Sequence, residues 1–280
     1  MRIGRTARLA PCLSALAVAF TMGMGSVFAY GQGGQEVGLE LVLLIDGSAS
    51  VNDEEFRLQT GGLATAFASA AVLDAIRALA PRGMAVCVVQ WADHTHQRKS
   101  IDWTVLRRDA DALRLAGQIA AMPRLIDGGH TAIGDALAFA LDELRSNRYS
   151  GLRRVIDVSG DGRANDGRPL RAARREVLEH GITINGLAIL NELPQLGKYF
   201  RKHLIGGEGA FVMTARDYTD FASAMRHKLE REIGSVPVSD NVIPDAVPDT
   251  IPGAIIEARA GQARQVHAAF APAGQSNAEE

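Results

Sequence analysis

Short apolar runs alternate with helix-like segments along most of this 280-residue chain, and this alternation most constrains its fold. The runs are apolar at nearly every position, which is typical of strands buried on both faces of a sheet. We predict strands over residues 39–45, 84–91, 155–158, 182–190 and 211–214, and helices over residues 53–80, 109–122, 131–147, 169–180 and 217–232. Residues 94–103 alternate with polar positions and predict an edge strand. The order of elements predicts an α/β fold: a doubly wound, mostly parallel central sheet with helices on both faces.

The N-terminal residues 1–29 predict a secretory signal peptide. Arginines at positions 2, 5 and 8 precede an apolar stretch over residues 9–28, and Val27 and Ala29 place small side chains before a cleavage site. The protein is therefore expected to be exported, either to the periplasm or into the medium. An uncleaved membrane anchor is the competing interpretation because the apolar stretch is long, although Pro11 and two glycines within it weaken a spanning helix.

Composition divides the rest of the chain and excludes some functions. Residues 30–37 predict a linker, residues 38–233 one domain, and residues 234–280 a Pro/Ala-rich tail without periodicity that is expected to be disordered. The formal net charge of −2 gives no indication of nucleic-acid binding. Cys87 is the single cysteine after the predicted cleavage, and its apolar surroundings predict a buried structural thiol.

Oxygen-bearing side chains cluster directly after the first apolar run. Asp46, Ser48 and Ser50 occupy alternate positions on the loop that leaves this strand, so they can surround one point. Hard divalent cations prefer oxygen ligands of this kind. Asp161 lies just past a later strand and Thr131 at the start of a helix, so both could complete the set at the same edge of the sheet.

These segments resemble the metal-ion-dependent adhesion site of the von Willebrand factor A (VWA) domain family. Residues 46–50 resemble its Asp-x-Ser-x-Ser signature, and residues 128–134 and 158–162 resemble its second and third elements in the same order. The resemblance covers residues 38–233 and implies the Rossmann-like VWA fold.

The resemblance also implies roles for each residue. Ser48, Ser50 and Thr131 would bind the cation through hydroxyls, while Asp46 and Asp161 would hold it directly or through water. One position would stay open for a Glu or Asp carboxylate of a protein partner. Mg²⁺ suits such a site, and Mn²⁺ or Ca²⁺ could replace it. In the alternative interpretation the two serines merely form a turn and cap the next helix, without metal.

The chain departs from the family pattern in its third element. A Thr commonly stands where Gly160 is found, and Asp157 lies within a strand where apolar residues are usual. These departures resemble a bacterial group of exported, uncharacterised VWA-like proteins. We expect Asp157 to be a satisfied buried carboxylate or a strand-end residue rather than a metal ligand. In some family members the last helix moves when the site is filled, and residues 217–232 are the corresponding candidate here by analogy.

Three classes of function follow from this reading. The favoured one is a non-enzymatic, cation-dependent protein-binding module. A metal-assisted hydrolase and a structural subunit that does not need metal are the alternatives. The pattern of a phospho-aspartate phosphatase is missing because Ser48 stands where its second Asp is required. His94 and His96 would share one side of an extended segment and could hold a transition metal, but exposed edge-strand positions are the favoured interpretation.

Overall fold

The computed structural model describes residues 34–234, so the predicted signal peptide and nearly all of the predicted tail lie outside the described residues. Six strands form one sheet in the order β3-β2-β1-β4-β5-β6. Neighbouring strands pair in parallel throughout, except that β3 runs antiparallel to β2. The strands are β1 (Gln35–Asp46), β2 (Met84–Trp91), β3 (Gln97–Leu106), β4 (Tyr149–Gly160), β5 (Thr183–Ile189) and β6 (Val212–Ala215).

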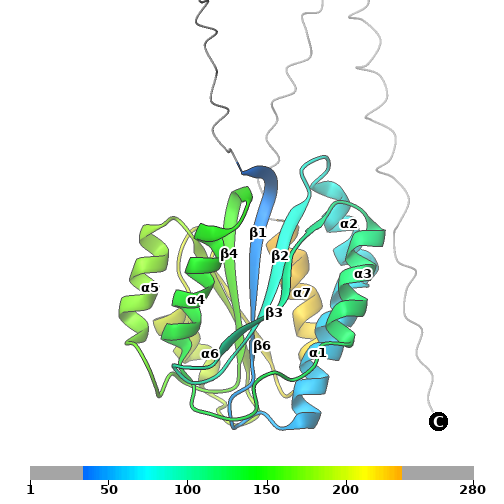
Figure 1. Cartoon of the computed structure of the whole chain (residues 1–280). Helices are drawn as coiled ribbons and strands as arrows, with labels where there is room; N and C mark the ends of the chain where they lie inside the picture. Colours follow the sequence, from blue (N-terminus) through cyan, green and yellow to red (C-terminus); the bar gives the residue numbers. More distant parts are fainter. Residues whose placement is uncertain (1–33, 235–280) are drawn as a thin grey trace, which may run out of the picture. The chain divides into compact units, whose positions relative to one another are not determined.

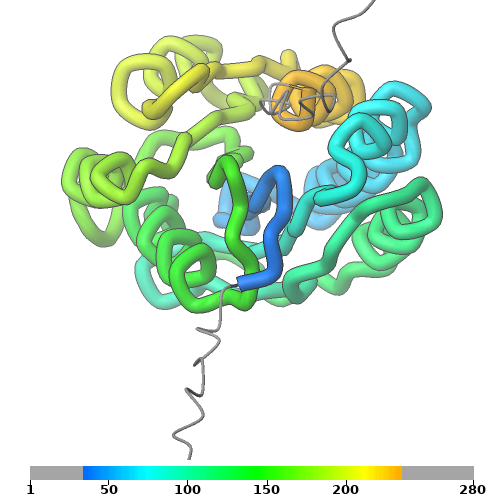
Figure 2. The backbone as a smooth tube through the Cα atoms, turned by 90° about the horizontal axis from the view of Figure 1, so that it is seen from above, coloured from blue at the N-terminus to red at the C-terminus, as the bar shows by residue number. Residues whose placement is uncertain are grey.

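Helices cover both faces of this sheet, which confirms the predicted doubly wound α/β fold (Figures 1 and 2). One layer holds α1 (Asp53–Phe67), α2 (Ala70–Ala78), α3 (Asp109–Ala120) and α7 (Phe221–Gly234). The other holds α4 (Ile133–Ser146), α5 (Leu170–Glu179), α6 (Leu196–Tyr199) and the π-helical turn Phe200–Leu204 that continues α6. No helix within residues 34–234 is long and apolar enough to cross a membrane.

The central strand β1 explains why the apolar runs are continuous. Leu41 and Leu43 pack into the core on the α1 side, whereas Val42 and Leu44 pack into the core on the α4 side. All four side chains are at most 1% exposed, because successive strand residues point to opposite faces and both faces are covered. Cys87 on β2 is likewise buried and forms no disulfide, as predicted.

Several element boundaries differ from the prediction. The predicted helix over residues 53–80 is two helices, because the hydroxyl of Ser69 accepts a hydrogen bond from Val72 N–H and starts a second helix. Strand β4 begins at Tyr149, six residues before the predicted start at residue 155, because its polar first half pairs with the start of β1. Residues 35–37 of the predicted linker form the start of β1.

The histidine pair was also misplaced by the sequence pattern. Strand β3 begins at Gln97, so His94 and His96 lie in the loop between β2 and β3 rather than on an edge strand. This loop is a tight reversal, in which Ala92 N–H donates to His96 O at 2.9 Å. Alternation of residue types cannot distinguish such a loop from the first residues of the strand that follows it.

Candidate metal centre

The predicted ligands are brought to one edge of the sheet by three connections. Asp46 is the last residue of β1, and Asp161 directly follows the last residue of its parallel neighbour β4. Thr131 lies two residues before α4. Strands β1 and β4 are adjacent where the strand order reverses direction, which is the usual ligand-binding place in open α/β sheets.

Short hydrogen bonds fix the loop that carries the first three residues. Ser48 N–H donates to Asp46 Oδ1 at 2.9 Å, and the buried amide of Gln59 on α1 donates to Asp46 O at 3.0 Å. The helix that follows begins with a capping box, in which Asn52 and Glu55 each accept the other's backbone N–H. Helix α1 is thus capped by Asn52, which leaves the hydroxyls of Ser48 and Ser50 available for another role.

The hydroxyls of this loop face Asp161. Ser50 Oγ donates to Asp161 Oδ1 at 2.7 Å, and Ser48 Oγ lies 3.3 Å from Ser50 Oγ. The other carboxylate oxygen, Asp161 Oδ2, accepts a hydrogen bond from Tyr218 OH at 2.9 Å. Sequence reasoning missed Tyr218, because nothing in the residues just before α7 indicates a contact 57 positions away.

Thr131 is held beside the same point by the loop after β4. Its N–H donates to Asn165 Oδ1 at 2.8 Å, and Asn165 N–H donates to Thr131 O at 3.0 Å. The Thr131 hydroxyl lies against Gly162, where an added Cβ would be 3.3 Å from Oγ1. Asn165 therefore positions Thr131 through two hydrogen bonds.

The electrostatics of the cluster favour a cation. Asp46 and Asp161 are both fully buried, and burial together with the charge of Asp161 raises the pKa of Asp46 to about 7. Burial also raises the pKa of the Tyr218 hydroxyl above its ordinary value. Within residues 34–234, Asp46 Oδ2 is a buried atom without a hydrogen-bond donor. Two buried carboxylates, an unpartnered oxygen and three hydroxyls fit a hard divalent cation.

A pocket of about 410 Å³ opens directly onto these groups. Its lining includes three of the predicted residues, Ser50, Thr131 and Asp161. The rest of the lining is Ala49, Gly129, His130, Gly162, Arg163, Asn165, Glu192 and Leu193. The pocket therefore offers an outside group a route to the cluster.

Gly160 has no side chain, and this leaves room for the carboxylate of Asp46. A Cβ at Gly160 would lie 2.8 Å from Asp46 Oδ2, closer than side chains tolerate, so Gly160→Ala must displace that carboxylate. We expect about 10- to 100-fold weaker cation binding in this variant, measured by calorimetry. Gly117→Ala on α3 is the matched control because no atom lies near its added Cβ, and its affinity should be unchanged. Equal affinities in both variants would contradict this role for Gly160.

Asp157 is excluded from the cluster, as predicted. It is 1% exposed within β4, and its Oδ2 lies 2.6 Å from Lys228 Nζ on α7. It is thus a buried carboxylate that is paired with a cation of the protein itself.

Comparisons with known proteins agree with this architecture. The model of the family described as "Protein of unknown function (DUF1194)" matches residues 36–237. A search of curated proteins found no match.

Solved structures similar to this chain contain the VWA fold. One is the vWF domain of the type V pili tip protein Mfa5 from Porphyromonas gingivalis, with a TM-score of 0.52 and 14% identity over 72% of this chain and 97% of that chain. Another is a von Willebrand factor type A structure from Catenulispora acidiphila, with a TM-score of 0.51 and 20% identity over 71% of this chain and 43% of that chain. A third is proximal thread matrix protein 1 from the mussel byssus, with a TM-score of 0.51 and 17% identity over 70% of this chain and 47% of that chain.

The chain thus spans less than half the length of the Catenulispora and mussel proteins. At these identities the likeness concerns the fold. Together with the family match over most of the chain, it shows that the protein belongs to the DUF1194 family and has the fold of a von Willebrand factor A domain.

Proposed function

We propose that this protein is a divalent-cation-dependent protein-binding module whose metal-ion-dependent adhesion site takes a carboxylate from its partner. The observation that carries the proposal is the convergence of Asp46, Ser48, Ser50, Thr131 and Asp161 beneath an open pocket. A bound cation would supply one electrophilic coordination position for an outside oxygen ligand. The proposal assigns Mg²⁺ because the donors are oxygens alone, and Mn²⁺ or Ca²⁺ are the substitutes to test.

The protein's own residues would orient both the cation and the partner. Ser48 and Ser50 would turn their hydroxyl lone pairs toward the cation, and Tyr218 would keep Asp161 in place by its hydrogen bond to Oδ2. Arg163 lines the pocket, with its guanidinium carbon 5.5 Å from the centre of the Tyr199 ring. Its positive charge on the rim would attract an acidic side chain of the partner.

Two of the similar structures come from pilus proteins, which supports binding rather than catalysis. One is a domain of a pilus tip protein, and another is the pilus adhesin SpaC from Lactobacillus rhamnosus GG, with a TM-score of 0.51 and 10% identity over 73% of this chain and 32% of that chain. Export, which the sequence of residues 1–29 supports, would place the module in the periplasm or outside the cell, where such partners are found. A metal-assisted hydrolase and a structural subunit without metal are the rival functions.

The test is titration of the full-length protein with Mg²⁺, Mn²⁺ and Ca²⁺ by calorimetry, with and without added acetate. Wild type should bind one cation, and acetate should tighten binding because its carboxylate can fill the open position. The double variant Ser48→Ala/Thr131→Ala should lose at least about 100-fold in affinity, because two ligands are removed. The control is Ser100→Ala/Thr104→Ala on β3, which likewise removes one serine and one threonine hydroxyl, but outside the pocket.

Partner capture separates the three functions. The proposal is supported if Ser48→Ala/Thr131→Ala no longer captures an acidic partner in the presence of the cation while the control variant still does. Loss of a hydrolytic turnover in that variant would indicate the enzyme instead. No cation binding by wild type, with or without acetate, would overturn the proposal and favour the structural subunit.

A further inference from the structure

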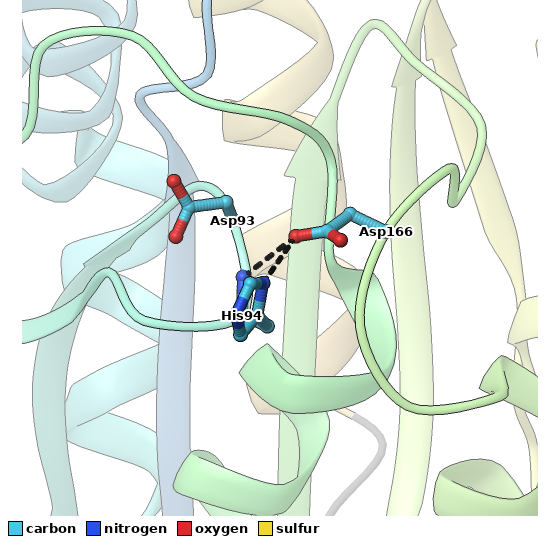
Figure 3. A group of neighbouring side chains, drawn as sticks. All are labelled: Asp93, His94 and Asp166. Carbon is cyan, nitrogen blue, oxygen red and sulfur yellow. Dashed lines mark hydrogen bonds and ion pairs between the residues drawn. The ribbon is translucent and has the colours of Figure 1, made fainter.

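A second cluster of metal-ligating side chains lies on two loops at the same edge of the sheet. Asp93 and His94 come from the β2–β3 loop, and Asp166 comes from the loop between β4 and α5 (Figure 3). One ligand atom from each residue lies within 4.8 Å of the other two. His94 Nδ1 is 2.7 Å from Asp166 Oδ2, and the same oxygen accepts the His94 backbone N–H at 3.0 Å.

We propose that Asp93, His94 and Asp166 form a second cation site, which takes Zn²⁺ or a similar late transition metal. An imidazole nitrogen with two carboxylates is a donor set that suits Zn²⁺, whereas the candidate metal centre offers oxygens alone. At zinc–ligand distances of about 2.0–2.2 Å, tetrahedral ligand atoms are separated by about 3.4 Å. The ligand atoms, which lie within 4.8 Å of one another, would have to approach by rotation of the side chains to enclose the ion.

Neighbouring groups already orient the two carboxylates. Asp93 Oδ1 accepts hydrogen bonds from the N–H and the hydroxyl of Thr95, both at 2.8 Å, and lies 2.8 Å from His96 Nδ1. These bonds leave Asp93 Oδ2 available. Asp166 is followed by Gly167, which has a positive φ of 73° and no room for a Cβ beside Asp135. Neighbouring groups that hold the ligands in this way are typical of metal sites and reduce the ordering that binding requires.

Exposure allows an ion to enter and to keep an open position. The side chain of His94 is 57% exposed and that of Asp166 is 23% exposed. With three protein ligands, the fourth position would be filled by water. The two loops also contact the candidate metal centre, because Asp93 Oδ2 lies against Gly129 and Asn165 accepts the N–H of Thr131. A metal joining the loops would therefore stabilise the region that positions Thr131.

The experiment uses the full-length chain without a polyhistidine tag, stripped with a chelator. Zn²⁺ affinity is measured by calorimetry, and Co²⁺ serves as a spectroscopic probe because its visible absorption reports nitrogen and oxygen ligands. The variants are His94→Ala and Asp166→Asn. The matched control is His227→Ala, which removes an exposed histidine of α7. Circular dichroism and thermal unfolding without metal verify that each variant is folded.

With the candidate metal centre filled by excess Mg²⁺, we expect one Zn²⁺ per chain in wild type and in His227→Ala, and at least tenfold weaker binding in His94→Ala and Asp166→Asn. Ser48→Ala/Thr131→Ala should keep its Zn²⁺ affinity while its Mg²⁺ affinity falls, so the two sites are tested independently. Zn²⁺ binding that survives in His94→Ala, or that is lost in Ser48→Ala/Thr131→Ala, would overturn the second site. Absence of Zn²⁺ binding in wild type would do the same.

Discussion

Replacing Lys228 with methionine is expected to lower the free energy of unfolding by about 3–5 kcal/mol, the largest change we predict for a single substitution. Lys228 lies on α7 and is fully buried. Its Nζ is 2.6 Å from Asp157 Oδ2 and 2.6 Å from Glu232 Oε1. Asn185 on β5 also donates to Glu232 Oε1, at 2.8 Å, so the cluster joins α7 to two strands. Methionine keeps most of the side-chain volume but removes a buried cation that lies beside two buried carboxylates.

The destabilisation should depend on pH. Burial and the neighbouring Glu232 raise the pKa of Asp157 to about 7, compared with about 3.9 in an unfolded chain. The folded state therefore binds more protons between these values, and its stability falls as pH rises through that range. Loss of the Lys228 charge raises the folded pKa of Asp157 further. The deficit of the variant should consequently be larger at pH 8 than at pH 5.

Urea unfolding at both pH values measures the effect. Lys202→Met is the matched control, because Lys202 is exposed and its replacement should change stability by less than about 0.5 kcal/mol. An equal deficit for Lys228→Met at pH 5 and pH 8 would show that packing, and not charge, accounts for the loss.

Asp161→Asn should abolish Mg²⁺ binding while leaving the metal-free protein at least as stable as wild type. The substitution keeps the shape of the side chain, and its amide can still bond with Ser50 and Tyr218. It removes a buried negative charge that destabilises ionised Asp46. A cation, by contrast, loses one of its two carboxylates, and we expect at least about 100-fold weaker binding. The substitution should thus lower the affinity for the cation without lowering the stability of the metal-free protein.

Calorimetry with Mg²⁺ and thermal unfolding in chelator measure these two quantities. Asp127→Asn is the matched control, since Asp127 is an exposed carboxylate on the loop that precedes Thr131. That variant should retain wild-type Mg²⁺ affinity. If Asp161→Asn retained it too, Asp161 would not be a ligand. If Asp161→Asn were much less stable without metal, its carboxylate would be structural.

Movement of α7 when the site is filled is a hypothesis that rests on analogy with other family members. The structure does connect the two, because Tyr218 lies three residues before α7 and its hydroxyl bonds to Asp161 Oδ2. Residues 1–29 likewise stay a predicted signal peptide, since they lie outside the described residues.

The sequence by itself determined the layers of the fold and the order of its elements. Runs such as residues 39–45 and 84–91 are apolar throughout because both faces of the sheet are covered, and that pattern is local. The oxygen-rich segment after β1 could also be predicted from the sequence, because its residues are neighbours in the chain. The sequence misplaced boundaries where polar residues belong to a strand because they pair with its neighbour, as Ser150 near the start of β4 pairs with Glu36 of β1.

Only the tertiary structure decided which distant residues complete each cluster. Tyr218 reaches Asp161 and Asn165 holds Thr131 through contacts that no local pattern encodes. Asp166 meets His94 across 72 positions, and Lys228 on α7 meets Asp157 on β4. Such contacts depend on how strands and helices pack, because side chains far apart in sequence meet only once the sheet has brought their loops together.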